Sequence, residues 1–515
     1  MNHLSNKKLR TFIIYAVAFL PLFDLDYLLF ELLDRFRIPR PSTIIIFVII
    51  PVVCFLTILK RKATRITTLA YCLTVLLYFL AHCYSVKNLM PKLFLTDNFR
   101  FSVYQELIYI IRLTLPLVMI VQFILLNPSI RELKQICCIL SGLISIPILL
   151  GDLFVFGLST YYGKTTANIF SWFTGIYEWY PPRTLASKFF FSEGNTIGIL
   201  LFMLLPILYY FLTCAQTKKE KHMIAGLILI QSLSMQILGT RVATYGAIII
   251  PVIFTILYIT DHFFVKSTPL KNHIIFFCLS ETLLCSGLLN YTPAVQNQKT
   301  DSKNDVALLS NKAGQEGRDE LNRLTGDIVR YSEEWRNFYV YMFETYGINA
   351  RFIQSVPSMY YTEYYSYQHD PEFWTYVTLE IPVFERVNGR QVERVFYNYK
   401  FQELTAKEKL LGMGFSNFMN GSIVLEQDFL QQYYSFGAFG EILLCIPWMI
   451  CIIAVVIKIL QKNLKMFSLF NTCIFTSLGA GFGAAYLSGH VLDQFMTSFF
   501  LSLLIAILLR SPRNL

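Results

Sequence analysis

Charged residues are scarce in this sequence. Asp, Glu, Lys and Arg make up 15% of its 515 residues, whereas a typical soluble domain has about 25%. Cysteine is missing from the longest polar stretch, residues 291–430, and all eleven cysteines lie in or beside apolar runs. The sequence therefore spells out no disulfide framework and no cysteine metal site. This composition excludes a soluble globular protein and indicates a polytopic membrane protein.

Several catalytic signatures are also missing. The sequence has no Gly-rich phosphate loop with a lysine, no nucleophile elbow and no HExxH pair. A cytoplasmic machine driven by nucleotide hydrolysis is therefore excluded, and no cofactor is expected.

What the chain has in abundance is long apolar runs. A helix of about twenty apolar residues crosses a bilayer, and we find about twelve such runs. They lie near residues 11–31, 42–59, 66–85, 104–126, 135–157, 192–213, 222–239, 242–262, 272–290, 432–459, 466–487 and 491–510. The basic segments "NKKLR", "KRKATR", "TKKEKH" and "QKNLK" then share one side, which predicts that both termini are cytoplasmic. The arginine-rich segment 34–40 is an exception.

The polar stretch 291–430 is expected on the outer side. It carries 14 Lys and Arg against 19 Asp and Glu, so the formal charge of +10 comes from the rest of the chain. Membrane topology explains that charge, and nucleic-acid binding is excluded. Within the stretch, apolar spacing predicts a helix ending near Gly347, and Asn388-Gly389 predicts the turn of a β-hairpin.

The predicted fold is an all-α polytopic membrane protein with about twelve transmembrane helices. Residues 1–290 hold the first nine spans, with an aromatic interfacial loop near 158–190. Residues 291–430 form a large extracytoplasmic α+β insert between the ninth and tenth spans, and residues 431–515 hold the last three spans.

Arg241 opens an apolar run directly after Gly239-Thr240. Small residues let a ligand approach closely, and a guanidinium can donate two hydrogen bonds to a phosphate. The alternative is an interfacial arginine whose charged end reaches the membrane surface, or one that pairs with an outer acid.

Three further arginines are candidates for a diphosphate site. Arg112 lies about seven residues into its span, and ionisable groups at that depth are functional hypotheses by default. Arg330 and Arg336 belong to the first predicted helix of the insert. The alternative for Arg330 is a solvated helix face with salt bridges.

Glu426 and Asp428 stand just before the tenth predicted span, where a carboxylate can take a proton from an attacking hydroxyl. The alternative for Glu426 is a charge at a helix start, which needs no catalytic role. The segment "SMYYTEYYSYQHDPEFWTY" is dense in tyrosine, which suits a sugar surface but more often indicates a membrane interface or a packed core.

Four features together resemble the O-antigen polymerase and O-antigen ligase group of bacterial membrane glycosyltransferases. They are "LGTRVATYG", "GDIVRYSEEWRNFYVYMFETYG", "LEQDFLQQYYSFGAFGEILL" and the large outer insert before the last three spans. The resemblance covers most of residues 190–510 in order. Ligases of the group carry a histidine where this chain has Glu426-Gln427-Asp428, and the chain looks more like ligase-like proteins of Gram-positive gene sets.

The resemblance implies a metal-independent, inverting transferase in the bacterial plasma membrane. Its donor and acceptor are undecaprenyl-diphosphate-linked oligosaccharides in the outer leaflet, and a chain-length regulator is a possible partner. Arg241 with Arg330 or Arg336 then holds the diphosphate, and Glu426, Asp428 or His490 is the general base. We interpret the chain as a polysaccharide polymerase. The alternatives are a ligase that transfers a finished glycan to a cell-surface acceptor and a lipid-linked oligosaccharide flippase.

Overall fold

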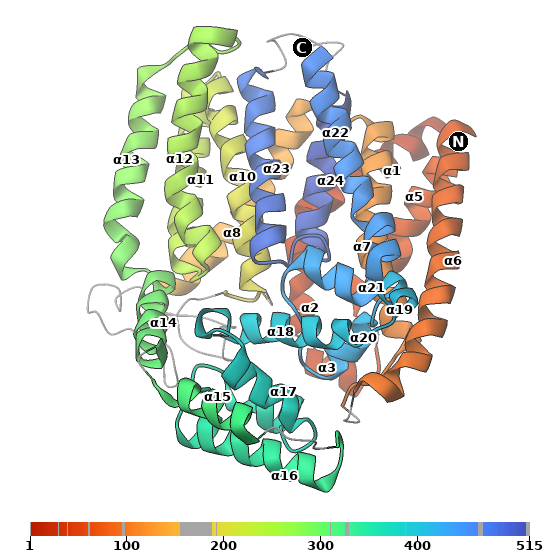
Figure 1. Cartoon of the computed structure of the whole chain (residues 1–515). Helices are drawn as coiled ribbons and strands as arrows, with labels where there is room; N and C mark the ends of the chain where they lie inside the picture. The colour runs from red at the N-terminus through yellow and green to blue at the C-terminus, as the bar shows by residue number, and fades with distance from the viewer. Residues whose placement is uncertain are drawn as a thin grey trace. The chain divides into compact units, whose positions relative to one another are not determined.

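A computed structural model describes residues 2–28, 30–38, 40–59, 62–94, 98–154, 188–191, 193–309, 311–324, 329–386, 388–461 and 467–510. Every secondary-structure element in these ranges is a helix, as expected for an all-α membrane protein (Figure 1). The chain divides into two compact units. Unit 1 comprises Met1–Tyr71, Ile111–Asn297 and Pro447–Leu515, and unit 2 comprises Cys72–Ile110 and Gln298–Ile446.

Unit 1 contains most of the apolar helices. Its short N-terminal elements are α1 (Asn2–Phe19), η1 (Leu20–Asp24), α2 (Leu25–Leu28), α3 (Phe30–Arg35), α4 (Pro41–Ile44), η2 (Ile45–Ile49) and α5 (Ile50–Leu59). The longer helices are α8 (Ile130–Leu153), α10 (Gly194–Cys214), α11 (Lys218–Ile237), α12 (Arg241–Thr260), α13 (Asn272–Leu288), α22 (Ile446–Gln461), α23 (Leu469–Leu487) and α24 (Phe495–Arg510). Two more, α6 (Lys62–Leu93) and α7 (Val103–Leu126), belong partly to each unit.

Helix α10 is the centre of unit 1. It packs against α8, α11, α12 and α23, and Figure 1 shows α10 to α13 and α23 running roughly parallel. Its side chains are apolar on every face, and Leu200, Leu204 and Leu208 are all fully buried. A helix that is hydrophobic all round is buried, either among other helices or in a membrane.

Eight segments of the described residues are long and apolar enough to cross a membrane. They are Pro41–Ile58, Thr64–Leu89, Val103–Leu126, Ile130–Leu153, Gly194–Cys214, Arg241–Val265, Asn272–Tyr291 and Asp428–Ile457. The first predicted span, residues 11–31, is divided among α1, η1, α2 and α3. The chain is thus a multi-pass membrane protein, and the count of twelve spans stays a prediction. Most of the predicted aromatic loop near 158–190 lies outside the described residues.

Unit 2 is made of short helices around an aromatic core. It contains α14 (Pro293–Leu309, mostly), α15 (Ala313–Leu324), α16 (Glu333–Met342), η5 (Phe343–Asn349), η6 (Tyr360–Tyr364), α17 (Pro371–Thr375), η7 (Tyr376–Glu380), η8 (Val383–Glu385), α18 (Gly389–Gln402), α19 (Ala406–Leu411), α20 (Phe415–Asn420) and α21 (Asp428–Leu444). Tyr365, Phe373 and Trp374, from the tyrosine-dense segment, are fully buried in its core. These three rings therefore serve packing.

Two predictions about the insert are wrong. No β-hairpin forms in residues 375–386 and 388–402: Asn388 instead caps α18, accepting a hydrogen bond from Gln391 N at 3.1 Å. Asn favours helix N-caps as well as tight turns, and the buried residues Val392 and Phe396 repeat with helical period. The predicted long helix is also interrupted, because α15 ends at Leu324 and Ser332 caps a new helix, α16.

Helix α21 kinks at Gly437, where another segment of the backbone passes close to it. Gly437 has φ +67° and ψ −175°, a region that is essentially restricted to glycine. Residues 410–414 run alongside, and Met413 N and Gly414 N donate to the carbonyls of Tyr434 and Ser435 at 3.0 and 2.8 Å. A Cβ at Gly437 would lie 2.5 Å from the carbonyl carbon of Leu410. Gly437, the first glycine of the segment "GAFG", thus permits this close approach.

Candidate functional site

The segment Gly239-Thr240-Arg241 is a turn that starts a membrane helix. Gly239 has φ +80°, which glycine adopts without steric cost. The Thr240 hydroxyl then accepts a hydrogen bond from Ala243 N at 3.4 Å and caps α12. Arg241 is the first helical residue, and its side chain is exposed. Its guanidinium therefore lies at the helix end where the first backbone N–H groups and the positive pole of the macrodipole favour an anion.

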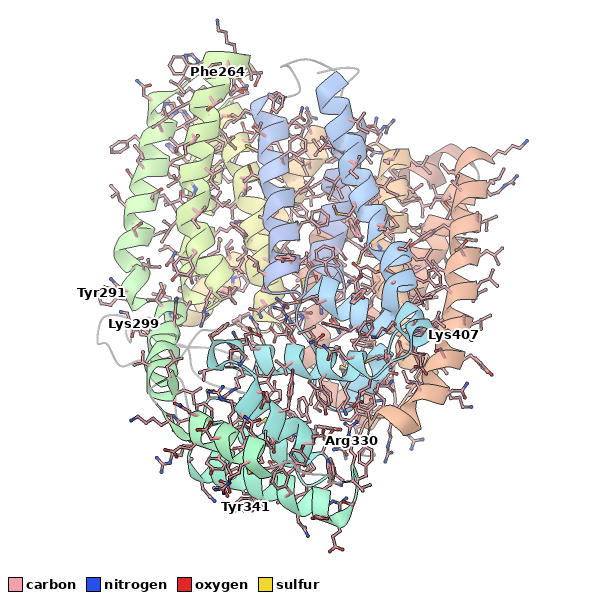
Figure 2. The ribbon with its side chains drawn as sticks, viewed as in Figure 1. Phe264, Tyr291, Lys299, Arg330, Tyr341 and Lys407 are labelled. Atoms are coloured by element: carbon pink, nitrogen blue, oxygen red, sulfur yellow. The ribbon has the colours of Figure 1, made fainter. Side chains whose placement is uncertain are left out.

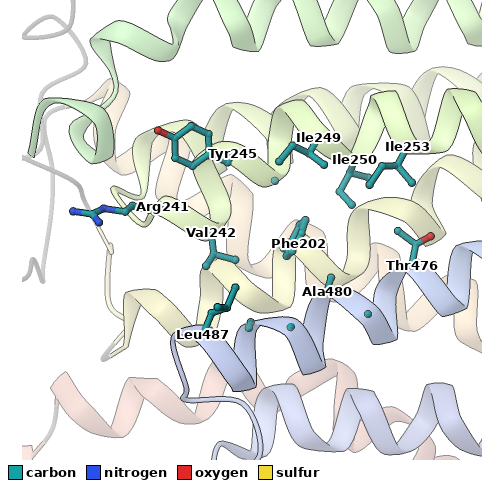
Figure 3. A pocket seen from close by; sticks show the side chains of 14 residues that line it. Phe202, Arg241, Val242, Tyr245, Ile249, Ile250, Ile253, Thr476, Ala480 and Leu487 are labelled. Atoms are coloured by element: carbon teal, nitrogen blue, oxygen red, sulfur yellow. The ribbon is translucent and has the colours of Figure 1, made fainter. Parts of the chain in front are cut away.

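An apolar pocket of about 530 Å³ begins at this helix end. Helix α12 lines it from Arg241 to Ile253, α10 contributes Phe202, and α23 contributes residues 476–487. Figure 3 shows Arg241 at one end of the pocket, with its guanidinium pointing away from the apolar lining. A rise of 1.5 Å per residue makes this lining about 18 Å long, more than half of the hydrocarbon core of a bilayer.

Helix α23 has two glycines on the side that faces the pocket, so no side chain fills the pocket at these positions. Gly479 and Gly483 both line it, and a Cβ added to either would meet no atom within 4 Å. Larger side chains at these two positions would therefore project into open space of the pocket. The pocket is lined by three helices that are far apart in sequence, and sequence reasoning identified only its arginine.

Arg112 lies in α7, inside a candidate span. Its side chain is half-buried, and its Nε atom is buried without a hydrogen-bond partner among the described residues. It is not among the residues that line the apolar pocket. Its role in diphosphate binding stays a prediction.

Arg330 is held by two carboxylates. Its Nε lies 2.9 Å from Glu372 Oε2, and its Nη2 lies 3.3 Å from Glu403 Oε1. The indole of Trp335 donates to the same Glu372 oxygen at 3.1 Å. Arg330 in the turn before α16 and Trp335 in the first turn of α16 thus both bind Glu372. Arg330 is 46% exposed and is labelled in Figure 2.

Arg336 differs from Arg330 in position and surroundings. It lies in the first turns of α16, and its side chain is exposed. The sequence had placed Arg330 and Arg336 on one helix, but Arg330 lies in the turn before α16 and only Arg336 belongs to that helix.

Glu426 belongs to a polar cluster in unit 2 that the sequence did not reveal. It forms an ion pair with Arg390 of α18. On the same helix, Glu393 accepts a hydrogen bond from the Tyr360 hydroxyl at 2.5 Å. Burial raises the pKa of Tyr360, and the negative charges of Glu393 and Glu426 raise it further. Tyr360 is therefore a hydrogen-bond donor near both carboxylates, while Arg390 holds Glu426 in place.

Asp428 and His490 have different surroundings. Asp428 is the first residue of α21 and is 1% exposed, so its carboxylate lies at a helix N-terminus, where negative charge is favoured. His490 is half-buried in the turn between α23 and α24 and has φ +60°.

The candidate residues are divided between the two units. Arg112, Arg241 and His490 belong to unit 1, whereas Arg330, Arg336, Glu426 and Asp428 belong to unit 2. Within the described ranges, no group of three or more His, Cys, Asp and Glu side chains could hold a metal ion.

The family described as "O-antigen ligase like membrane protein" matches residues 6–511, nearly the whole chain. No curated protein and no solved structure matches the chain.

Proposed function

We propose that this chain, which belongs to the O-antigen ligase-like family of membrane proteins, is a polysaccharide polymerase. The family supports a polysaccharide-related transferase of the glycosyltransferase type. It transfers glycan from an undecaprenyl-diphosphate-linked donor to a sugar hydroxyl of a second lipid-linked repeat unit in the outer leaflet of the plasma membrane. Both termini are cytoplasmic, and the insert is extracytoplasmic.

The observation that carries this proposal is the cationic end of the apolar pocket. Arg241 and the N-terminus of α12 match a diphosphate, and the apolar walls of α10, α12 and α23 match an isoprenoid chain. A volume of about 530 Å³ lies in the range of ligand pockets in general. The pocket holds the part of the isoprenoid next to the diphosphate, and the rest of the isoprenoid extends into the lipid.

The reaction needs a stabilised leaving group and a proton acceptor. The acceptor hydroxyl attacks the anomeric carbon with inversion, and the bond from that carbon to the diphosphate oxygen breaks. The diphosphate leaves with the electron pair, stabilised by Arg241, and the hydroxyl proton passes to Glu426. Arg336 and Arg112 are proposed as further diphosphate contacts. Arg330 is a weaker candidate because Glu372 and Glu403 already neutralise it.

The proposal is tested by the size of the product. The purified protein is reconstituted in liposomes with its lipid-linked repeat unit, and the glycans are resolved by length. A ladder of repeat multiples on lipid is expected. Transfer of a single finished glycan to a surface acceptor would indicate a ligase instead. A substrate that stays one unit long but changes leaflet would overturn the enzyme assignment in favour of a flippase.

Filling the pocket should weaken donor binding. We expect Gly479→Leu and Gly483→Leu to raise KM for the donor by about tenfold, because each side chain occupies space that the isoprenoid needs. Gly226→Leu in α11 is the matched control, since a Cβ there also meets nothing within 4 Å and Gly226 does not line the pocket. Equal KM values for all three variants and the wild type would place the lipid elsewhere.

Removing the proposed base should slow the chemical step. We expect Glu426→Gln to lower kcat by about 10²-fold and to abolish the acidic limb of the pH–rate profile. Glu385→Gln, an exposed carboxylate of the same unit, is the control. If Asp428→Asn or His490→Asn removes that limb and Glu426→Gln leaves it intact, the base is the residue whose loss removes it.

A further inference from the structure

Arg386 is a fully buried cation in unit 2, outside the site described above. Its side chain has 0% exposure. Nη1 donates to the Phe352 carbonyl at 2.8 Å and Nε to the Ile381 carbonyl at 3.2 Å. The guanidinium also lies over the Phe352 ring, 4.3 Å from its centroid. Two of its nitrogens are therefore engaged, and one face is covered by an aromatic ring.

The third nitrogen is unsatisfied. Arg386 Nη2 is buried and has no hydrogen-bond partner among the described residues. In the same ranges, no carboxylate forms an ion pair with Arg386. A buried charge without a counter-charge is costly, and a buried donor without an acceptor is rare in folded proteins. Such a group needs an explanation, and a water, an ion or a ligand bound at that atom supplies one.

The charged neighbour of Arg386 is a second arginine. Burial lowers the pKa of Arg386 to about 10, and the positive charge of Arg318 contributes to that decrease. Arg318 lies on α15, is exposed, and donates to the Leu379 carbonyl at 3.3 Å. Arg318 and Arg386 thus both donate to carbonyls of the chain segment 379–386, Arg318 from the surface and Arg386 from the interior.

Close packing of α15 fixes this arrangement. A Cβ at Gly314 would lie 2.2 Å from the Phe352 ring, the ring that covers Arg386, and a Cβ at Gly317 would lie 2.7 Å from Leu379. Residues larger than glycine would push α15, and with it Arg318, away from this segment.

We propose that Arg318 and Arg386 form a binding site for an oxyanion, a phosphate or carboxylate group. The planar guanidinium geometry suits both groups, because either offers two oxygens to a pair of N–H donors. Arg318 and Arg386 belong to unit 2, whereas Arg241 belongs to unit 1. We assign the oxyanion to an acidic substituent of the glycan, and this assignment rests on the proposed function. The binding of an anion to the two arginines does not depend on it.

The test uses thermal unfolding of the full-length purified protein in detergent, without any activity measurement. Inorganic phosphate is titrated against chloride at constant ionic strength, so that general screening is unchanged. A ligand that binds only the folded state raises Tm, and we expect a rise of about 3 °C or more at saturation. The same titration with glucuronate distinguishes a carboxylate-bearing sugar from a phosphate group as the source of the anion.

Variants locate the effect. Arg318→Gln changes an exposed residue, so it should fold, and we expect it to lose most of the phosphate-dependent rise in Tm. Arg386→Gln should lose it completely if that variant folds. Arg323→Gln, an exposed arginine on the same helix, and Arg241→Ala should keep it. Absence of a rise in the wild type, or an undiminished rise in Arg318→Gln, would overturn the proposal and leave Arg386 as a structural link between carbonyls. If Arg241→Ala keeps the phosphate-dependent rise in Tm, anion binding does not depend on the diphosphate site of the proposed function, so the two proposals can fail separately.

Discussion

Replacing Arg241 with alanine should lower the initial rate of polymer formation by about 10²–10³-fold, the effect of deleting one donor that stabilises charge in a transition state. The reason is that the leaving diphosphate gains negative charge as the glycosidic bond breaks, at the end of α12 where Arg241 is the first residue. The measurement is the rate at which the ladder of products appears in liposomes, with donor held above KM.

Two further variants interpret that result. Arg241→Lys keeps the charge but loses the two-pronged geometry, so its rate should lie between those of the wild type and the alanine variant. Arg131→Ala, an exposed arginine in the first turn of α8, should be close to wild type. A wild-type rate in Arg241→Ala would remove this residue from the mechanism and restore the interpretation of an interfacial arginine.

Lys400→Met should reduce the free energy of unfolding by about 3–5 kcal/mol, the usual cost of removing one partner from a buried ion pair. Lys400 Nζ lies 3.1 Å from Asp370 Oδ2, and the two side chains are only 2% and 3% exposed. Asp370 also accepts from the Tyr365 hydroxyl at 2.6 Å and from Phe373 N at 3.1 Å. Without Lys400, the Asp370 carboxylate keeps these two hydrogen bonds but loses its counter-charge inside the aromatic core of unit 2.

The measurement is denaturant unfolding of the purified protein in mixed micelles, followed by tryptophan fluorescence because Trp374 lies in the same core. Lys407→Met is the control: Lys407 is exposed on α19 and labelled in Figure 2, and its loss should change stability by less than about 0.5 kcal/mol. The double variant Lys400→Met/Asp370→Asn should recover part of the loss. If Lys400→Met is as stable as Lys407→Met, the buried pair contributes nothing to folding.

The wrong prediction of a hairpin shows where local signals fail. Asn388-Gly389 is compatible with both a tight turn and a helix cap, since the Asn side chain suits either. The choice was made by packing: the buried residues Val392, Phe396 and Tyr397 all belong to the aromatic core of unit 2, on one side of α18. No residue near Asn388 reveals that this core exists.

The surroundings of Arg330 were equally hidden from the sequence, and its role as a diphosphate contact stays a prediction. The sequence places Arg330 and Trp335 five residues apart, but their shared partner Glu372 lies about forty residues later. Glu426 likewise shows no sign in sequence of its partner Arg390. Long-range pairs of this kind depend on the fold that brings the segments together, so spacing alone does not predict them.

The sequence by itself determined the membrane class and the start of α12, because apolar runs and the Gly-Thr cap depend on residues that are neighbours in the chain. It also determined the family, because the motifs follow one another in a fixed order along the chain. Only the tertiary structure decided that Arg241 stands at the end of a pocket and that Arg386 is fully buried. Both features need side chains from helices that are distant in sequence, and burial and cavity shape exist only once those helices pack together.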